Sequence, residues 1–122
     1  MYKDPENHLK AVHWANERNL VMIGDEVGNL LTIDSRMPQK ILNKTEVSNR
    51  TIRKLCFNGS KKFGVVSESN SVKIINIDDC STAYKHRADK IIYDMCWDEN
   101  DETTFYVVGE GFYAEQVRMV SN

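Results

Sequence analysis

The sequence has few of the features that mark disulfide-rich or membrane-spanning proteins. Its 122 residues include only 3 cysteines and 2 prolines. No apolar run approaches the roughly 20 residues needed to cross a bilayer. The opening stretch from Met1 to Glu6 lacks the apolar core of a secretory signal. These absences predict an intracellular protein that lies in the cytoplasm, with the nucleus as a further location.

The chain also lacks an excess of charge of one sign. It has 16 Lys and Arg against 18 Asp and Glu, which gives a net charge of −2, and the two signs are interleaved. The basic clusters Lys61-Lys62 and Lys85-His86-Arg87 fall at a predicted turn and on a predicted outer strand, where solvated charge is ordinary. The pattern therefore predicts no nucleic-acid partner.

No motif for catalysis or cofactor binding stands out. The histidines have no Ser or Cys nucleophile at a spacing that would link them; they are His8, His13 and His86. Gly109-Glu-Gly111 lacks the third glycine and the following helix of a phosphate loop. We therefore predict a protein that is not an enzyme, with no catalytic, cofactor-binding or metal-binding residues and no cofactor.

Two features resemble metal or disulfide sites without completing one. The acidic run Asp98–Glu102 lacks the glycine and the final glutamate of a calcium loop, so we interpret it as a solvated hairpin turn. Cys56 and Cys96 each precede a strand-end aromatic, and Cys80 leaves the cysteine count odd. We expect the two equivalent thiols to be buried as small hydrophobic groups rather than in a disulfide or a metal site.

What the sequence does contain is a repeat. Short apolar strands end in a large aromatic at Trp14, Phe57 and Trp97, which are 43 and 40 positions apart. Each is followed by two further strand-like runs, and the first two units add a polar fourth run. Four strands in a period of about 40 to 45 residues are typical of a β-propeller blade.

The repeat predicts an all-β partial propeller over residues 1–122. Its antiparallel, four-stranded blades would cover approximately residues 9–44, 52–87 and 92–120, the last without its outer strand, and helix content would be close to nil. Because a closed ring usually has about four to eight blades, we expect a C-terminal piece of a longer propeller, or a chain that self-associates. The outer flanks of the first and last blades would then be apolar and exposed.

The strand and turn composition supports this interpretation. Inner runs such as Leu20–Ile23 and Phe105–Val108 are almost continuously apolar, as expected for strands that are covered on both faces. The intervening segments Gly28-Asn29 and Asn58-Gly-Ser60 contain residues that suit tight hairpins.

These residues resemble the WD-repeat family, in which the second and third strands of a blade follow a Ser-x-Asp-Gly-Thr pattern that ends in Trp-Asp. Ser67-Glu-Ser-Asn-Ser-Val-Lys-Ile-Ile-Asn76 has that spacing, with Ile75-Asn76 at the position of Trp-Asp. Val27-Gly-Asn-Leu-Leu-Thr-Ile-Asp34 matches it from the turn onward, and Val117-Arg118 stands at the dipeptide position of the third unit.

Within this family the chain resembles the last blades of methylosome WD-repeat subunits of the Valois type. The supporting segments are Val12-His-Trp14, Gly24-Asp-Glu-Val-Gly28 and Tyr93-Asp-Met-Cys-Trp97. The resemblance implies a non-enzymatic scaffold for protein–protein interactions. It would help a type II protein arginine methyltransferase to engage substrates such as Sm proteins, without a nucleic-acid or membrane partner.

An alternative function comes from the end of the first unit. The segment Ile33-Asp-Ser-Arg36 resembles the Trp-Asp-x-Arg end of blades that dock on the adaptor of cullin-4 ubiquitin ligases. That resemblance implies a substrate receptor that uses Asp34 and Arg36. Aromatics in predicted loops are further candidates for a binding face, but the sequence assigns no individual partner-binding residue; they are Tyr2, Tyr84, Phe112 and Tyr113.

Overall fold

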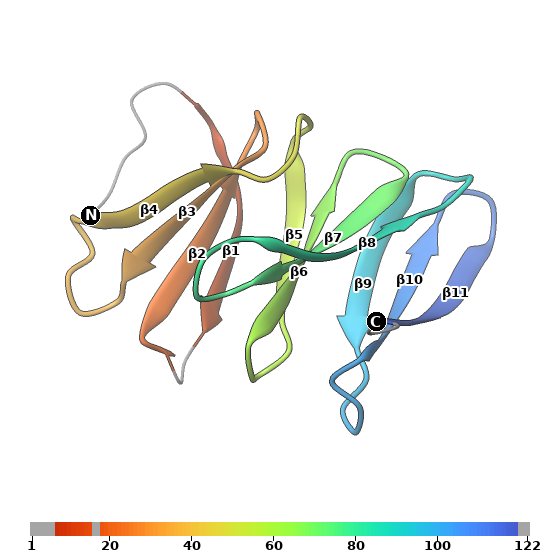
Figure 1. Cartoon of the computed structure of the whole chain (residues 1–122). Coiled ribbons are helices and arrows are strands. Elements are labelled where there is room, and N and C mark those ends of the chain that lie inside the picture. Colours follow the sequence, from red (N-terminus) through yellow and green to blue (C-terminus); the bar gives the residue numbers. More distant parts are fainter. Residues whose placement is uncertain (1–6, 16–17, 120–122) are drawn as a thin grey trace.

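The computed structural model describes residues 7–15 and 18–119, which form eleven β-strands and no α-helix. Figure 1 shows three sheets that follow one another along the chain. Blade 1 contains β1 (Leu9–Ala15), β2 (Leu20–Asp25), β3 (Asn29–Asp34) and β4 (Ile41–Glu46). Blade 2 contains β5 (Ile52–Phe57), β6 (Lys62–Ser67), β7 (Ser71–Asn76) and β8 (Thr82–Arg87). Blade 3 contains β9 (Ile92–Trp97), β10 (Thr104–Gly109) and β11 (Tyr113–Arg118).

Each blade is an antiparallel sheet whose strands pair in chain order. Blades 1 and 2 have four strands, and blade 3 has three within the described residues. This architecture confirms the all-β fold class that the repeat predicts. Short strands joined by tight turns leave no room for the longer crossover that parallel pairing would require.

The β2–β3 turn shows how the local sequence fixes a hairpin. The buried carboxylate of Asp25 accepts hydrogen bonds from the backbone N–H groups of Val27 (3.1 Å) and Asn29 (2.8 Å). Gly28 adopts φ 97°, a conformation that is costly for a residue with a Cβ atom. Its carbonyl oxygen then accepts the N–H groups of Val47 and Ser48, which anchors the connection to blade 2.

The three units align in strand register. Trp14, Phe57 and Trp97 lie directly opposite Val21, Phe63 and Phe105 on the second strands. Those residues in turn lie opposite Ile33, Ile75 and Val117 on the third strands. The residues that stand in place of the WD-repeat tryptophan therefore occupy the same position in each blade, and all three are buried.

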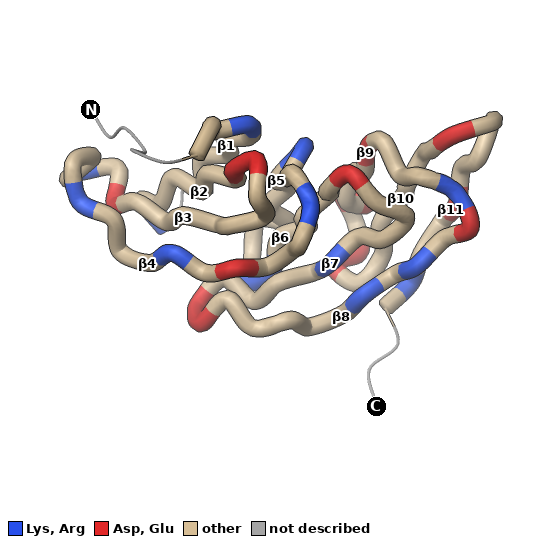
Figure 2. Tube along the Cα trace, turned by 90° about the horizontal axis from the view of Figure 1, so that it is seen from above, with Lys and Arg blue, Asp and Glu red and all other residues tan. Residues whose placement is uncertain are grey.

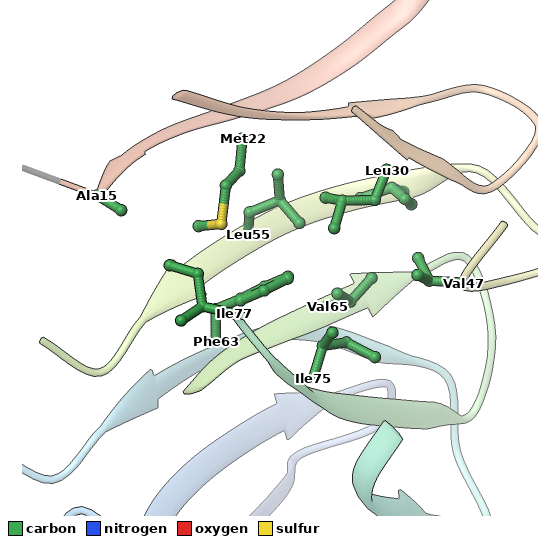
Figure 3. Packing of buried hydrophobic residues seen from close by; sticks show 10 residues of the cluster. Ala15, Met22, Leu30, Val47, Leu55, Phe63, Val65, Ile75 and Ile77 are labelled. Carbon is green, nitrogen blue, oxygen red and sulfur yellow. The ribbon is translucent and has the colours of Figure 1, made fainter. Parts of the chain in front are cut away.

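Two hydrophobic cores join the blades. The first lies between blades 1 and 2 and contains Met22, Leu30, Leu55 and Phe63 among its buried residues (Figure 3). The second, between blades 2 and 3, comprises Val66, Val72, Ile74, Ala88, Ile92, Met95, Phe105, Val107 and Val117. Full burial of each large apolar side chain contributes about 1.5–3 kcal/mol, so apolar packing is the main force that holds the stack together.

Polar contacts also cross from blade to blade. The indole Nε1 of Trp97 donates to the carbonyl oxygen of Cys56 (2.7 Å), and the Nζ of Lys54 pairs with Asp94 (2.5 Å). Between blades 1 and 2, the Thr51 hydroxyl donates to the carbonyl oxygen of Glu26 (2.6 Å). These bonds orient each blade against the next one.

The strand-end aromatics are equivalent in position but not in burial. Phe57 and Trp97 are half-buried and pack against the blade that precedes them in the chain. Trp14 is 58% exposed, because its side of blade 1 faces away from blade 2. Phe57 and Trp97 are therefore shielded by the blade that precedes each of them in the chain, and Trp14 has no such blade among the described residues.

The expected burial of the cysteines is also partly wrong. Cys56 is half-buried and packs against the second core, whereas Cys96 is exposed. This position of the first strand faces the following blade, and no described residue covers that side of blade 3. Cys80 lies in a turn with φ 59° and is half-buried. Burial raises the pKa of the Cys56 and Cys80 thiols.

Candidate functional site

A cleft of about 630 Å³ lies between blades 1 and 2. One wall is the β4–β5 connection, and the other comprises the β6–β7 turn with the outer strands β7 and β8. The connection and the turn lie at the same end of the sheets (Figure 1), where the Glu68 N–H donates to the carbonyl oxygen of Thr51.

The cleft is lined by cations. Lys73 on β7 lies directly opposite Lys85 on β8, and Ser71 lies opposite Arg87, so three basic side chains share one face of blade 2. Figure 2 shows basic positions on these neighbouring strands. Arg50 adds a fourth cation from the facing connection, while Glu46 is the one carboxylate among the lining residues. The cleft is therefore electropositive.

The remaining lining groups are hydroxyls and amides. Ser67, Ser69 and Ser71 form a chain of hydroxyl contacts at 3.2 and 3.3 Å in the β6–β7 turn. The Nζ of Lys73 donates to the carbonyl oxygen of Val47 (2.7 Å), which holds the ammonium group between the two walls. The cleft therefore presents positive charges and neutral hydrogen-bond donors side by side.

Sequence reasoning missed this cleft. It noted Lys85-His86-Arg87 as a solvated cluster on an outer strand, and both Lys85 and Arg87 are indeed exposed. Lys73 is 12 positions away, and only the β7–β8 register places it beside Lys85. The site could have been predicted by pairing the two strands as a hairpin about the turn at residues 78–81, which places Lys73 opposite Lys85.

The histidines that the sequence analysis weighed lie in separate surroundings. His13 is half-buried on β1 with its ring 6.4 Å from that of Phe57, and burial lowers its pKa. His8 lies 3.7 Å from the Glu26 carboxylate. His86 faces blade 3, where its Nε2 lies 3.3 Å from the Tyr113 hydroxyl.

The aromatic candidates divide into core and surface residues. Tyr84 and Tyr113 are half-buried against the second core, and burial together with the hydrogen bond to Glu115 raises the pKa of Tyr113 to about 12. Phe112 is fully exposed in the β10–β11 turn, with φ 68°. Tyr2 lies outside the described residues. Of the aromatics described, Phe112 is the one available at a loop tip.

Two carboxylates of the acidic run Asp98–Glu102 accept hydrogen bonds from the turn and from the adjacent strand β10. Asp98 accepts from the Asn100 N–H and from the Tyr106 hydroxyl, each at 2.8 Å. Asp101 accepts from the hydroxyl and N–H of Thr103, and these bonds lower its pKa to about 2. Among residues 7–15 and 18–119, no group of three or more His, Cys, Asp or Glu side chains is arranged to hold a metal ion.

Asp34 and Arg36, the pair weighed for adaptor docking, bind each other. The Nε and Nη2 of Arg36 donate to the two carboxylate oxygens of Asp34 at 3.0 and 2.9 Å. This bidentate contact lowers the pKa of Asp34. The Arg36 side chain is still 70% exposed, but a partner carboxylate would have to compete with Asp34 for the same guanidinium N–H groups.

The outer flank of blade 1 carries exposed apolar side chains. Val12 is 69% and Trp14 58% exposed, and both lie on the side of β1 that faces away from blade 2. On the opposite flank of the stack, Val108 and Cys96 are also exposed. These surfaces match the expected open flanks of a partial propeller.

We predict that Trp14→Ser weakens self-association of this chain, because Trp14 supplies the largest exposed apolar area on the blade 1 flank. Sedimentation velocity over a range of concentrations should show the association of the unsubstituted chain and its reduction in the variant. Phe112→Ser is the control, since it removes an even more exposed aromatic from a turn away from the blade 1 flank. A stable, monodisperse monomer at high concentration for the unsubstituted chain would contradict the prediction.

No helix among the described residues has the length and apolarity to cross a membrane. No family model matches the chain, and no curated protein matches it in sequence. The crystal structure of the Myceliophteria thermophila Cps50 (Swd1) β-propeller domain is similar, with a TM-score of 0.78 and 11% sequence identity. The similarity covers 97% of this chain and 39% of that one. At such identity it establishes the fold alone, which is that of stacked β-propeller blades.

Proposed function

We propose that this chain belongs to a WD-repeat scaffold that mediates protein–protein interactions and has no enzymatic activity of its own. The observation that carries the proposal is the shared register of Ile33-Asp34 and Ile75-Asn76. Both dipeptides end the third strand of a propeller blade, at the position of the Trp-Asp motif. Rigid blades that present many loops and a polar cleft suit the binding of several proteins.

The proposed partners are a type II protein arginine methyltransferase and its substrates, such as Sm proteins. The segments that resemble methylosome subunits lie on β1, in the β2–β3 turn and on β9. Asp25 organises the turn Gly24–Gly28 through its hydrogen bonds, and Tyr93–Trp97 forms most of β9. In this function the propeller holds the substrate near the enzyme, in the cytoplasm and in the nucleus.

Co-purification tests this proposal. The chain should associate with the methyltransferase, and adding it should increase methylation of an Sm protein by the enzyme in a radiolabel transfer assay. The chain alone should transfer no methyl group. Absence of any association with the methyltransferase would end this proposal and leave the propeller fold unaffected.

A cullin-4 substrate receptor is the alternative function, favoured by one observation. Asp34 holds the Arg36 guanidinium in one orientation at the outer end of blade 1, where it is accessible. Arg36→Ala should abolish binding to the ligase adaptor if this alternative is correct, and should leave methyltransferase binding unchanged if the first proposal is correct. Pull-down of each partner with the same variant separates the two functions.

A further inference from the structure

We infer that the cleft between blades 1 and 2 binds an acidic peptide segment of a partner protein, through phosphoserine or clustered carboxylates. The inference deepens the proposed scaffold function, on which it rests, by naming the chemistry of one partner segment. It does not depend on which protein carries that segment.

The first observation is an unfavourable arrangement of charge. Lys73 and Lys85 lie directly opposite each other on paired strands, and like charges in that position destabilise a sheet. Neither they nor Arg50 or Arg87 lies within 4 Å of a carboxylate in the described part of the chain. An anionic ligand would relieve this repulsion.

The second observation is that the blade architecture does not require a cation at the position of Lys73. Position for position, Lys73 corresponds to Leu31 in blade 1 and to Glu115 in blade 3, as the pairing with Ile23, Val65 and Val107 shows. Leu31 is fully buried, and Glu115 bonds to the Tyr113 hydroxyl. The basic side chain at this position is therefore a property of this cleft and not of the blade architecture.

The third observation is the supply of neutral donors. The Ser69 and Ser71 hydroxyls and the Asn49 and Asn70 amides line the cleft together with the cations. Phosphate and carboxylate groups accept several hydrogen bonds at once, and bonds to charged acceptors are the stronger ones. The cleft has room for a short peptide segment, with the acidic groups on blade 2 and the peptide backbone beside the β4–β5 connection.

Fluorescence anisotropy with labelled peptides tests the inference. The probes are one short peptide with adjacent phosphoserines, the same peptide with glutamate at those positions, and the same peptide with unmodified serine. The phosphoserine form should bind most tightly, because each phosphate carries about −1.5 to −2 charges, and the serine form should not bind. Raising the ionic strength should weaken binding, since the Debye length is only about 10 Å at 0.1 M salt.

Charge reversal locates the site. The double variant K85E/R87E should weaken binding of the phosphoserine peptide by roughly tenfold or more, because two attractive pairs become repulsive. The matched control is K40E/K90E, which makes the same change in net charge at exposed positions outside the cleft and should retain affinity. The milder variant K85Q/R87Q should lose affinity while keeping or raising the thermal midpoint, because it removes like-charge repulsion.

Three results would overturn the inference. These are equal affinity for all three peptides, an equal loss of affinity in the K40E/K90E control, and tighter binding of a single-stranded RNA that depends on the same residues. The outcome is separable from that of the proposed function. Peptide binding without methyltransferase association would refute only the methylosome proposal, and the reverse result would refute only the inference that the basic cleft binds an acidic peptide.

Discussion

Phe105→Ala should lower the free energy of unfolding by about 3–5 kcal/mol, the usual cost of removing a fully buried phenylalanine. The Phe105 side chain has no exposed surface and lies in the centre of the core between blades 2 and 3. Its ring contacts three other rings, with centroid distances of 5.5 Å to Trp97, 6.4 Å to His86 and 6.5 Å to Tyr84. Alanine would leave a cavity that these rings cannot fill without changing rotamer.

Urea denaturation followed by tryptophan fluorescence measures this loss directly, because Trp97 reports on the affected interface. Phe112→Ala is the matched control. It removes the same ring from a fully exposed position, so the free energy of unfolding should change by no more than about 0.5 kcal/mol. Similar losses in the two variants would show that Phe105 does not hold blade 3 to blade 2.

Gly28→Ala should destabilise the chain by about 3–5 kcal/mol for two independent reasons. The residue adopts φ 97°, where a Cβ atom is strained. A Cβ atom would also lie 2.0 Å from the carbonyl oxygen of Ser48, which is backbone and cannot turn away. The substitution would force the β4–β5 connection away from the β2–β3 turn.

Substitutions at two other glycines distinguish backbone strain from steric overlap of the added Cβ atom. Gly111 has φ 70° with nothing near the added Cβ, so Gly111→Ala should cost only about 1–2 kcal/mol through backbone strain. At Gly109 the added Cβ would lie 2.3 Å from the Ile91 carbonyl oxygen without a positive φ, so steric crowding alone acts there. Thermal unfolding of the three variants should rank Gly28→Ala as the most destabilised. A loss at Gly28 no larger than that at Gly111 would contradict the tight contact with Ser48.

The strands and turns of this chain could be predicted from local pattern. The predicted runs Leu20–Ile23 and Phe105–Val108 lie within β2 and β10, and the predicted turns at Gly28-Asn29 and Asn58-Gly-Ser60 join paired strands. The expectation that both faces of these two runs are covered is only partly met, because each run belongs to an end blade whose outer face is less buried. The period between Trp14, Phe57 and Trp97 also predicted which residues occupy equivalent positions, because blades repeat the same strand register.

What the sequence could not show is which face of each strand has a neighbour. Trp14 and Cys96 belong to the same repeat as their half-buried counterparts, yet both are exposed because they lie on the outer flanks of the described stack. The candidate cleft could not be predicted from the sequence for a related reason. Lys73 and Lys85 are distant in sequence, and their proximity depends on β7–β8 pairing and on the position of blade 1.

The middle sheet has one consequence for the molecule as a whole. Strands β5 to β8 pack against a core on each side, whereas each end sheet has one such core in the described residues. In such stacks each blade is stabilised by its own folding and by its interfaces with the neighbouring blades. A blade with two interfaces therefore unfolds less readily than a blade with one. Fraying should therefore begin at either end, with the central hairpins as the last to open.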